Sequence, residues 1–134
     1  MTDINFKNNE GILLMRFSEF SFHDSAIKRV CFEIDVNYDF FKAKTQVESE
    51  RFDFEDLIIG LNKIYQREWK SIGFSPIEKQ FSMQFDLQEN GQINVHVKLN
   101  NPMFTGKFEF KYVIDQTFIP ELIKEIETAI KENT

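Results

Sequence analysis

The segment GKFEFKYVIDQTFIPELIKEIETAIK, residues 106–131, contains the two sequence patterns that decide the fold. From Phe108 to Ile114 every second residue is aromatic or aliphatic, which is the period of a strand with one apolar face. From Leu122 to Ile130 apolar residues recur every three or four positions, as on one side of a helix. The segment therefore predicts a strand, a short turn and an amphipathic helix.

An earlier segment has the same order, because residues 41–47 predict a strand and residues 54–65 predict a helix. Asp53, with Asp56 three residues later, has the pattern of a helix N-cap. A shift of 65 residues places the apolar positions that begin at Leu57 on those that begin at Leu122. An internal duplication and two similar solutions to one packing problem both explain this match, and the sequence leaves both open.

The remaining chain predicts further strands joined by short turns. Residues 11–22 predict a strand that bends near Ser18, and Glu89-Asn90-Gly91 predicts a tight hairpin turn. We expect residues 1–10 to be flexible and residues 66–76 to form a loop. The predicted fold class is α+β, with an antiparallel sheet of about six strands and two helices in the order βββα–βββα. One domain is expected over residues 1–134.

The composition is that of a globular protein, with 42% hydrophobic and 28% charged residues. The chain contains 16 Phe, many of them at alternate positions, and these are expected in the core of the protein. A formal net charge of −6 and a pI of about 5.0 argue against nucleic acids and anionic membranes as partners. The single cysteine, Cys31, and the absence of a signal-like N-terminus favour a cytoplasmic location.

The sequence predicts no catalytic, metal or cofactor site. His23, His96 and Cys31 are too few and too far apart in sequence for a typical zinc site. The adjacent residues 23–25 (His-Asp-Ser) are a poor nucleophile set, because adjacent side chains rarely reach the geometry of a catalytic triad. Neither phosphate-binding glycine motif is present.

Two features are candidates for a protein interface. Acidic residues gather around Glu48, Glu50 and Glu55, where they either favour the start of the following helix or bind a partner. Trp69 lies among charged residues in the predicted loop, where it either contacts a partner or closes the end of the sheet together with Phe74. Glu48, Glu50, Glu55 and Trp69 are therefore the predicted interface residues.

Three motifs stand out along the chain: FKAKTQVESERFDFEDLIIGL at 41–61, FSPIEKQFSMQFDLQENGQINVHVKL at 74–99 and FEFKYVIDQTFIPELI at 108–123. With these motifs and the order of its elements, the chain resembles the WapI-type immunity proteins of bacterial polymorphic toxin systems. The resemblance spans residues 11–131. These motifs consist of packing and capping residues, so no binding residue is transferred from the family.

The resemblance implies a cytoplasmic protein that binds and neutralises the C-terminal toxin domain of a cognate toxin and is not an enzyme. An acidic surface would suit a basic toxin domain. Two alternatives stay open: a module that self-associates through an open sheet edge, and a small enzyme that uses the carboxylate cluster. The oligomeric state, monomer or homodimer, is also left open.

Overall fold

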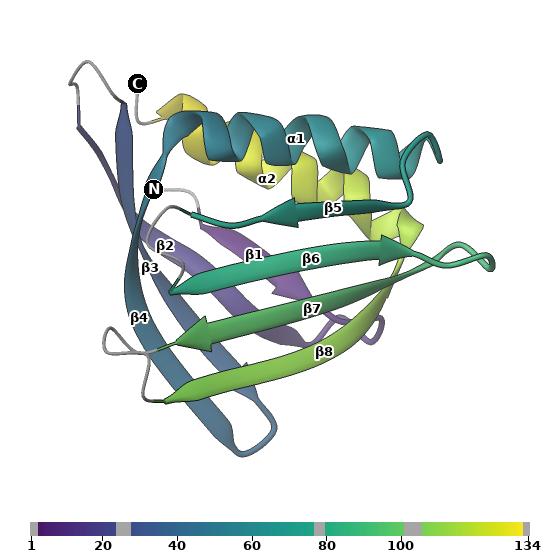
Figure 1. Cartoon of the computed structure of the whole chain (residues 1–134), viewed down its shortest axis with the longest axis horizontal. Helices are drawn as coiled ribbons and strands as arrows, with labels where there is room; N and C mark the ends of the chain where they lie inside the picture. Colours follow the sequence, from purple (N-terminus) through teal and green to yellow (C-terminus); the bar gives the residue numbers. More distant parts are fainter. Residues whose placement is uncertain (1–2, 24–27, 77–79, 101–105, 133–134) are drawn as a thin grey trace.

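Two antiparallel four-stranded sheets and two helices make up the computed structural model, which describes residues 3–23, 28–76, 80–100 and 106–132 (Figure 1). The first sheet has the order β1-β2-β3-β4, with bounds Ile4–Lys7, Leu13–His23, Arg29–Tyr38 and Phe41–Glu50. The second has the order β5-β6-β7-β8, with bounds Ser71–Phe74, Phe81–Leu87, Gln92–Asn100 and Lys107–Asp115. Helix α1 (Arg51–Tyr65) follows β4, and α2 (Ile119–Glu132) follows β8 after a 3₁₀ turn, Gln116–Phe118.

The α+β class and the two helices are confirmed, but the prediction of one sheet with about six strands is wrong. Two short strands were missed. Ile4–Lys7 forms β1 where flexible residues were expected, and Ser71–Phe74 forms β5 within the predicted loop. Each has only four residues, which is too short for a periodic pattern to stand out. Both nevertheless bury two apolar side chains, as a half-buried strand does.

The two sheets pack face to face around phenylalanine rings. Phe17 on β2 lies at the centre, with its ring centroid 4.7 Å from that of Phe6 and 4.9 Å from that of Phe32 in the same sheet. Across the interface it lies 6.1 Å from Phe74 and 5.5 Å from Phe81. These separations are those of tilted and edge-to-face aromatic pairs. The core therefore lies between the two sheets, as the abundance of Phe predicts.

Both helices lie side by side at one end of this sandwich (Figure 1). Helix α1 contacts β5 and α2 contacts β1, so the helices cover one edge of each sheet. Glu125 of α2 accepts hydrogen bonds from the backbone N–H and side-chain amide of Asn5 on β1, at 3.1 and 2.7 Å. Strands β4 and β8 form the opposite edges.

Two local predictions are confirmed. The pairing of β2 with β3 shifts register between Ser18 and Ser21, and Glu19 has a positive φ of 54°, so β2 does bend near Ser18. The turn after β6 contains Gly91 with φ of 85°, and the Gly91 N–H donates to the carbonyl of Gln88 at 3.1 Å. This turn fixes the register of β6 against β7.

A close approach between α1 and β5 explains the glycine within the helix. A Cβ atom at Gly60 would lie 2.9 Å from Cγ2 and 3.2 Å from Cβ of Ile72. Real Cβ atoms essentially never come within 3.0 Å of another heavy atom, so a larger residue would push β5 away from the helix. Glycine is a poor helix former, but at this position its lack of a side chain allows α1 to pack closely against β5.

We expect Gly60→Ala to lower the free energy of unfolding, by about 1–3 kcal/mol, although alanine is the better helix former. The cause is the clash with Ile72, so the same change should be less costly in an Ile72→Ala background. Urea denaturation of the four proteins measures both effects. A Gly60→Ala variant more stable than the parent would contradict the close approach.

Candidate binding surface on helix α1

The outward side of α1 combines large apolar side chains with carboxylates. The apolar residues Phe54, Leu57, Leu61 and Ile64 face the core. On the other side Phe52 and Ile59 are 52% and 51% exposed, and Glu55 and Asp56 lie between them in the exposed stripe. Residues 52, 55, 56 and 59 share one helix face because they are three or four positions apart. We call these four residues the α1 surface.

The start of α1 explains part of the acidic cluster. The helix begins at Arg51 and its N-cap is Glu50, so the prediction of Asp53 as N-cap is wrong. Asp53 instead occupies the third helical position, where its Oδ2 accepts a hydrogen bond from the Glu50 N–H at 2.9 Å. Burial raises the pKa of Asp53 above its ordinary value of 3.8, although this hydrogen bond acts in the opposite direction. Glu50 and Asp53 therefore serve the helix start.

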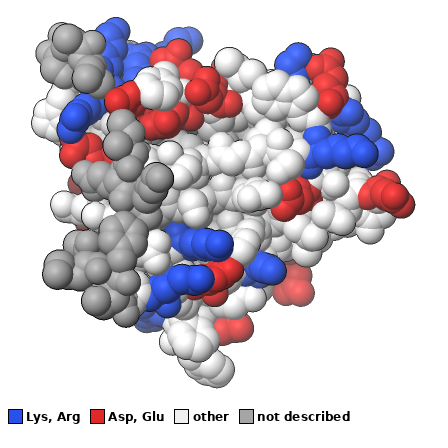
Figure 2. Space-filling view, in the orientation of Figure 1, with Lys and Arg blue, Asp and Glu red and all other residues white. Residues whose placement is uncertain are grey.

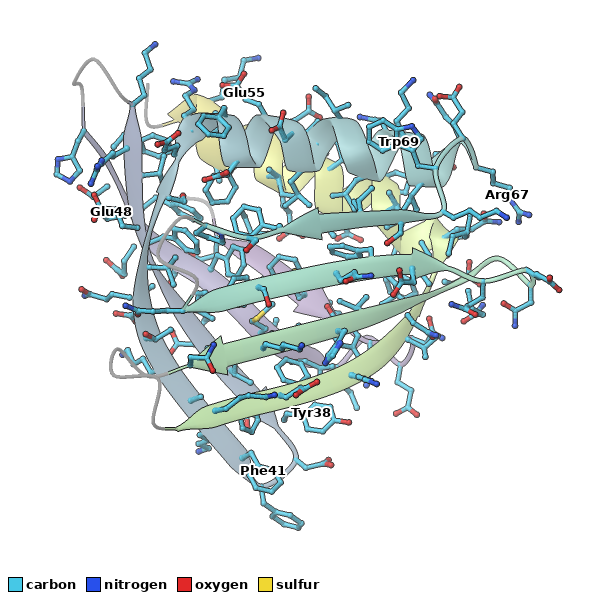
Figure 3. The ribbon with its side chains drawn as sticks, in the orientation of Figure 1. Tyr38, Phe41, Glu48, Glu55, Arg67 and Trp69 are labelled. Atoms are coloured by element: carbon cyan, nitrogen blue, oxygen red, sulfur yellow. The ribbon has the colours of Figure 1, made fainter. Side chains whose placement is uncertain are left out.

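The other two predicted acidic residues make ion pairs. Glu48, near the end of β4, pairs with Arg29 on β3 at 2.6 Å. Glu55 lies one helical turn from Arg51, and their charged atoms are 3.7 Å apart. Figure 3 places Glu48 and Glu55 at the same end of α1, and Figure 2 shows acidic side chains gathered there. The structure thus brings the predicted acidic residues together.

Trp69 lies at the other end of α1 (Figure 3). A 15-residue helix is about 22 Å long, so Trp69 cannot share one compact site with Glu48 and Glu50. Its side chain is 47% exposed, whereas Phe74 is buried, so the two do not close the sheet together. Figure 2 shows mainly basic side chains at this end, to the right, and Lys63 pairs with Glu68 there at 2.7 Å.

Sequence reasoning missed Phe52 and Ile59. The sequence does contain a pattern that indicates their exposure. Phe52 and Ile59 are seven residues apart, which places them on one helix face, opposite the apolar stripe that begins at Phe54. Phe52, Phe54 and Ile59 are all large apolar residues of the same motif, so residue type does not distinguish them. Their positions around the helix axis decide that Phe54 is buried and that Phe52 and Ile59 are exposed. Exposed large apolar residues beside charged ones are typical of protein interfaces.

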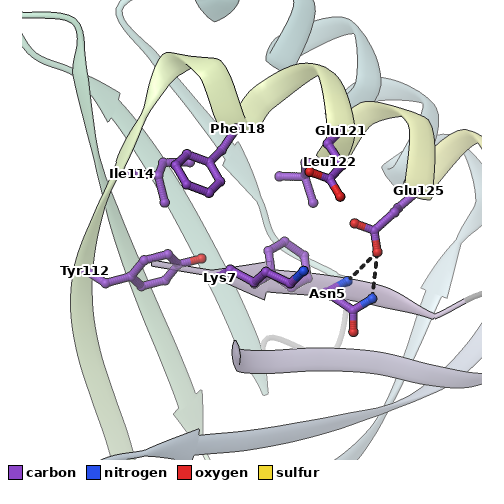
Figure 4. A pocket seen from close by; sticks show the side chains of 9 residues that line it. Asn5, Lys7, Tyr112, Ile114, Phe118, Glu121, Leu122 and Glu125 are labelled. Atoms are coloured by element: carbon purple, nitrogen blue, oxygen red, sulfur yellow. Dashed lines mark hydrogen bonds between the residues drawn. The ribbon is translucent and has the colours of Figure 1, made fainter. Parts of the chain in front are cut away.

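The cavity between β1 and α2 is too small for a typical small-molecule substrate. It is lined by Asn5, Tyr112 and Glu125 among others, and has about 30 Å³ (Figure 4). Ligand pockets usually have roughly 300–1,000 Å³. Burial raises the pKa of Tyr112, whose hydroxyl stays protonated. The Asn5–Glu125 hydrogen bonds at this cavity hold α2 to β1, which is a structural role.

Other candidate chemistry also finds no support in the residues that the structure describes. Among them no group of three or more His, Cys, Asp or Glu side chains could hold a metal ion. His96 contacts Glu109 on the neighbouring strand, and Lys107 holds the pKa of Glu109 below its ordinary value of 4.5, with His96 acting in the same direction. His23 is exposed at the end of β2, and residues 24 and 25 of the weighed His-Asp-Ser set lie outside the described residues. No described helix has the length and apolar character needed to cross a membrane.

A model of the immunity protein WapI-like family matches residues 4–133. The chain belongs to that family. No curated protein matches it. Among solved structures, the MRP1/MRP2 proteins of Trypanosoma brucei are similar, with a TM-score of 0.51 and 11% identity, covering 98% of this chain and 83% of that one. This similarity shows a shared fold and does not extend to function.

Two plant structures are also similar over most of the chain. The transcriptional regulator PBF-2 has a TM-score of 0.46 and 9% identity, covering 96% of this chain and 78% of that one. WHY1 from Arabidopsis thaliana has a TM-score of 0.46 and 8% identity, covering 96% of this chain and 81% of that one. The functional argument therefore rests on the WapI-like family and on the surface of this chain.

Asp53→Asn tests the electrostatics of the helix start, because it keeps an acceptor for the Glu50 N–H and removes the charge. The folded protein holds the Asp53 proton more tightly than the unfolded chain, so ionisation of Asp53 costs stability above its pKa. The free energy of unfolding of the parent, minus that of the variant, should therefore fall as the pH rises past the ordinary Asp pKa of 3.8. Urea denaturation at several pH values measures it, with the exposed Glu55→Gln as control. A difference that rises with pH would mean that the helix dipole outweighs burial.

Proposed function

We propose that this immunity protein binds the C-terminal toxin domain of a cognate polymorphic toxin through the α1 surface and thereby blocks the toxin. In this proposal the protein is a single cytoplasmic domain that acts by occupying a surface and catalyses no reaction. Membership of the WapI-like immunity family supports the role, and the exposed face of α1 supports the location.

The observation that carries the location is the exposure of Phe52 and Ile59 on a well-formed helix. Protein interfaces have a buried apolar centre surrounded by a polar rim, and a few large side chains usually provide most of the binding energy. Phe52 and Ile59 supply such a centre, and Glu55 and Asp56 supply part of the rim. The helix backbone is already ordered, which reduces the entropy lost on binding.

The charge of the surface indicates a basic partner. The whole chain has a formal net charge of −6, and acidic side chains gather at the N-terminal end of α1 (Figure 2). Opposite charges steer two proteins together and raise the association rate, and the effect weakens as salt screens it. Glu48 and Glu50 add negative charge next to the α1 surface, while Trp69 lies beyond its far end. In this proposal the first two contribute to steering, and Trp69 extends the contact.

We expect the protein, co-expressed with the toxin encoded by the neighbouring gene, to form a complex with equal numbers of the two chains and to relieve toxicity. Co-purification followed by light scattering measures the stoichiometry, and growth of the expressing cells measures protection. An unrelated toxin domain of similar charge is the specificity control. Failure to bind or to protect against the neighbouring toxin would refute the proposal.

Two variants of the α1 surface should affect different rate constants of toxin binding. Phe52→Ser with Ile59→Ser should raise the dissociation rate at least about tenfold, because it removes the apolar centre. Glu55→Lys with Asp56→Lys should mainly slow association and flatten its dependence on salt. Surface plasmon resonance at several salt concentrations separates the two effects.

Matched controls lie on other exposed surfaces of the same chain. Glu127→Lys changes charge on α2, and Val113→Ser removes an exposed apolar side chain from β8. Neither control should change the association or dissociation rate of the toxin by more than about twofold, apart from the change in association rate that the altered net charge itself causes. Equal effects of the controls and the α1 variants would remove the α1 surface from the proposal, even if the complex itself forms.

A further inference from the structure

A second surface lies at the end of the molecule opposite the helices, where the β3–β4 hairpin meets β8 (Figure 1). A groove of about 640 Å³ opens there, lined by Tyr38 and Phe41 of the hairpin and by residues 107–111 of β8. The Tyr38 and Phe110 rings are 5.0 Å apart, and the Phe41 and Phe108 rings are 5.8 Å apart. We call this the aromatic groove.

The walls of the groove are held in place. The Tyr38 hydroxyl donates a hydrogen bond to the backbone carbonyl of Lys111 at 3.3 Å, which ties the hairpin to the outer edge of β8. Strand β8 pairs with β7 throughout its length, and strand β4 pairs with the whole of β3. A preformed groove of this kind loses little conformational entropy when it is filled.

The tip of the same hairpin carries an unusually exposed aromatic residue. Phe40 is 99% exposed and its neighbour Phe41 is 59% exposed, in a chain whose other described Phe residues are mostly buried. Asp39 precedes them with a positive φ of 55°, which fixes the turn so that Phe40 projects from its tip. A fully solvated phenylalanine side chain loses its unfavourable contact with water when it enters an apolar site.

The charges of the tip and the groove are complementary. The tip carries Asp39, and the groove carries Lys107 and Lys111. Lys107 already pairs with Glu109 at 3.0 Å. Across residues 3–23, 28–76, 80–100 and 106–132, neither Asp39 nor Lys111 has an ion-pair partner. Each therefore has a charge available for a contact outside its own chain.

We infer that two copies of this chain associate about a two-fold axis, with the Asp39–Phe40 tip of each copy in the aromatic groove of the other. The tip and the groove are adjacent on one chain. Under a two-fold axis, each copy therefore inserts its tip into the groove of the other at the same interface. Such a dimer leaves no tip or groove open to a third copy, so no filament forms. Phe40 packs against the rings of Tyr38 and Phe108 of the second copy, and Asp39 meets its Lys111. The outer edge of β8 is also shielded in such a dimer.

A second copy fits this surface better than the toxin does. The toxin proposed above is basic, and Lys111 of the groove repels a basic partner. The hairpin supplies both an apolar side chain and the acidic group that Lys111 attracts. The dimer leaves the α1 surface free, because the hairpin and the helices lie at opposite ends of the molecule (Figure 1).

Sedimentation equilibrium of the full chain over a wide concentration range tests the dimer. The parent should be a reversible dimer, and Phe40→Ser should raise the dimer dissociation constant at least about tenfold. Phe52→Ser is the matched control, since it removes an equally large exposed ring from the other end and should leave dimerisation unchanged. Phe40→Ser should fold normally, because its side chain makes almost no contact within its own chain.

A double-mutant cycle tests the proposed pairing of Asp39 with Lys111. Asp39→Asn removes the charge and keeps a residue type that tolerates a positive φ, and Lys111→Gln removes the other charge. Each single change should weaken the dimer severalfold, and the double change should weaken it no more than either single change. Fully additive effects would overturn this pairing.

A chain that stays monomeric at all concentrations, or a dimer that Phe40→Ser leaves intact, would overturn the inference. If the chain is monomeric and Phe40→Ser abolishes toxin binding, the hairpin belongs to the toxin interface instead. The dimer and the proposed toxin binding are tested by different variants, so either hypothesis can be refuted without the other. Phe40→Ser should still bind and neutralise the toxin, and the variant of Phe52 and Ile59 should still dimerise.

Discussion

The contact between two phenylalanine-rich sheet faces is the constraint on which the rest of this structure depends. Each sheet has one apolar face, and the chain supplies only two helices, too few to cover both faces. The faces therefore cover each other, with Phe17 in contact with Phe74 and Phe81 across the interface. Rings of this size fill the space between the sheets with few side chains, in tilted and edge-to-face pairs.

This arrangement leaves open ends, and the helices close only one of them. Phe54 of α1 enters the core beside Phe32 and Phe74, with ring centroids 5.4 and 5.1 Å away, while α2 is anchored to β1 through Glu125. Because one side of α1 is committed to the core, the opposite side must face solvent or a partner. At the other end no helix is left, and the β3–β4 hairpin reaches across to β8 instead. The two proposed interaction surfaces are thus direct consequences of how the core is closed.

The sequence predicted the elements better than their assembly. Long alternating runs such as residues 30–36 and 93–99 were recognised because seven or more residues set the period, whereas β1 and β5, with four residues each, were not. Alternation also specifies which face of a strand is apolar but not what covers it, so one sheet was expected where there are two. The acidic residues lie at the start of α1 as expected, whereas Trp69, a separate candidate, lies at the far end of the helix. Phe52 and Phe40 were missed because their exposure depends on helix phase and turn geometry, not on residue type.

The two proposed surfaces differ in charge, and this difference suits them to the separate partners proposed above. Acidic side chains gather at the N-terminal end of α1, where they would attract a basic domain, whereas Lys111 of β8 would attract the acidic tip of a second copy. The core between them is closely packed, and the two surfaces lie at opposite ends of it. Dimerisation would then present two α1 surfaces that point away from the two-fold axis. If both proposals hold, two immunity chains would bind two toxin domains, one at each α1 surface.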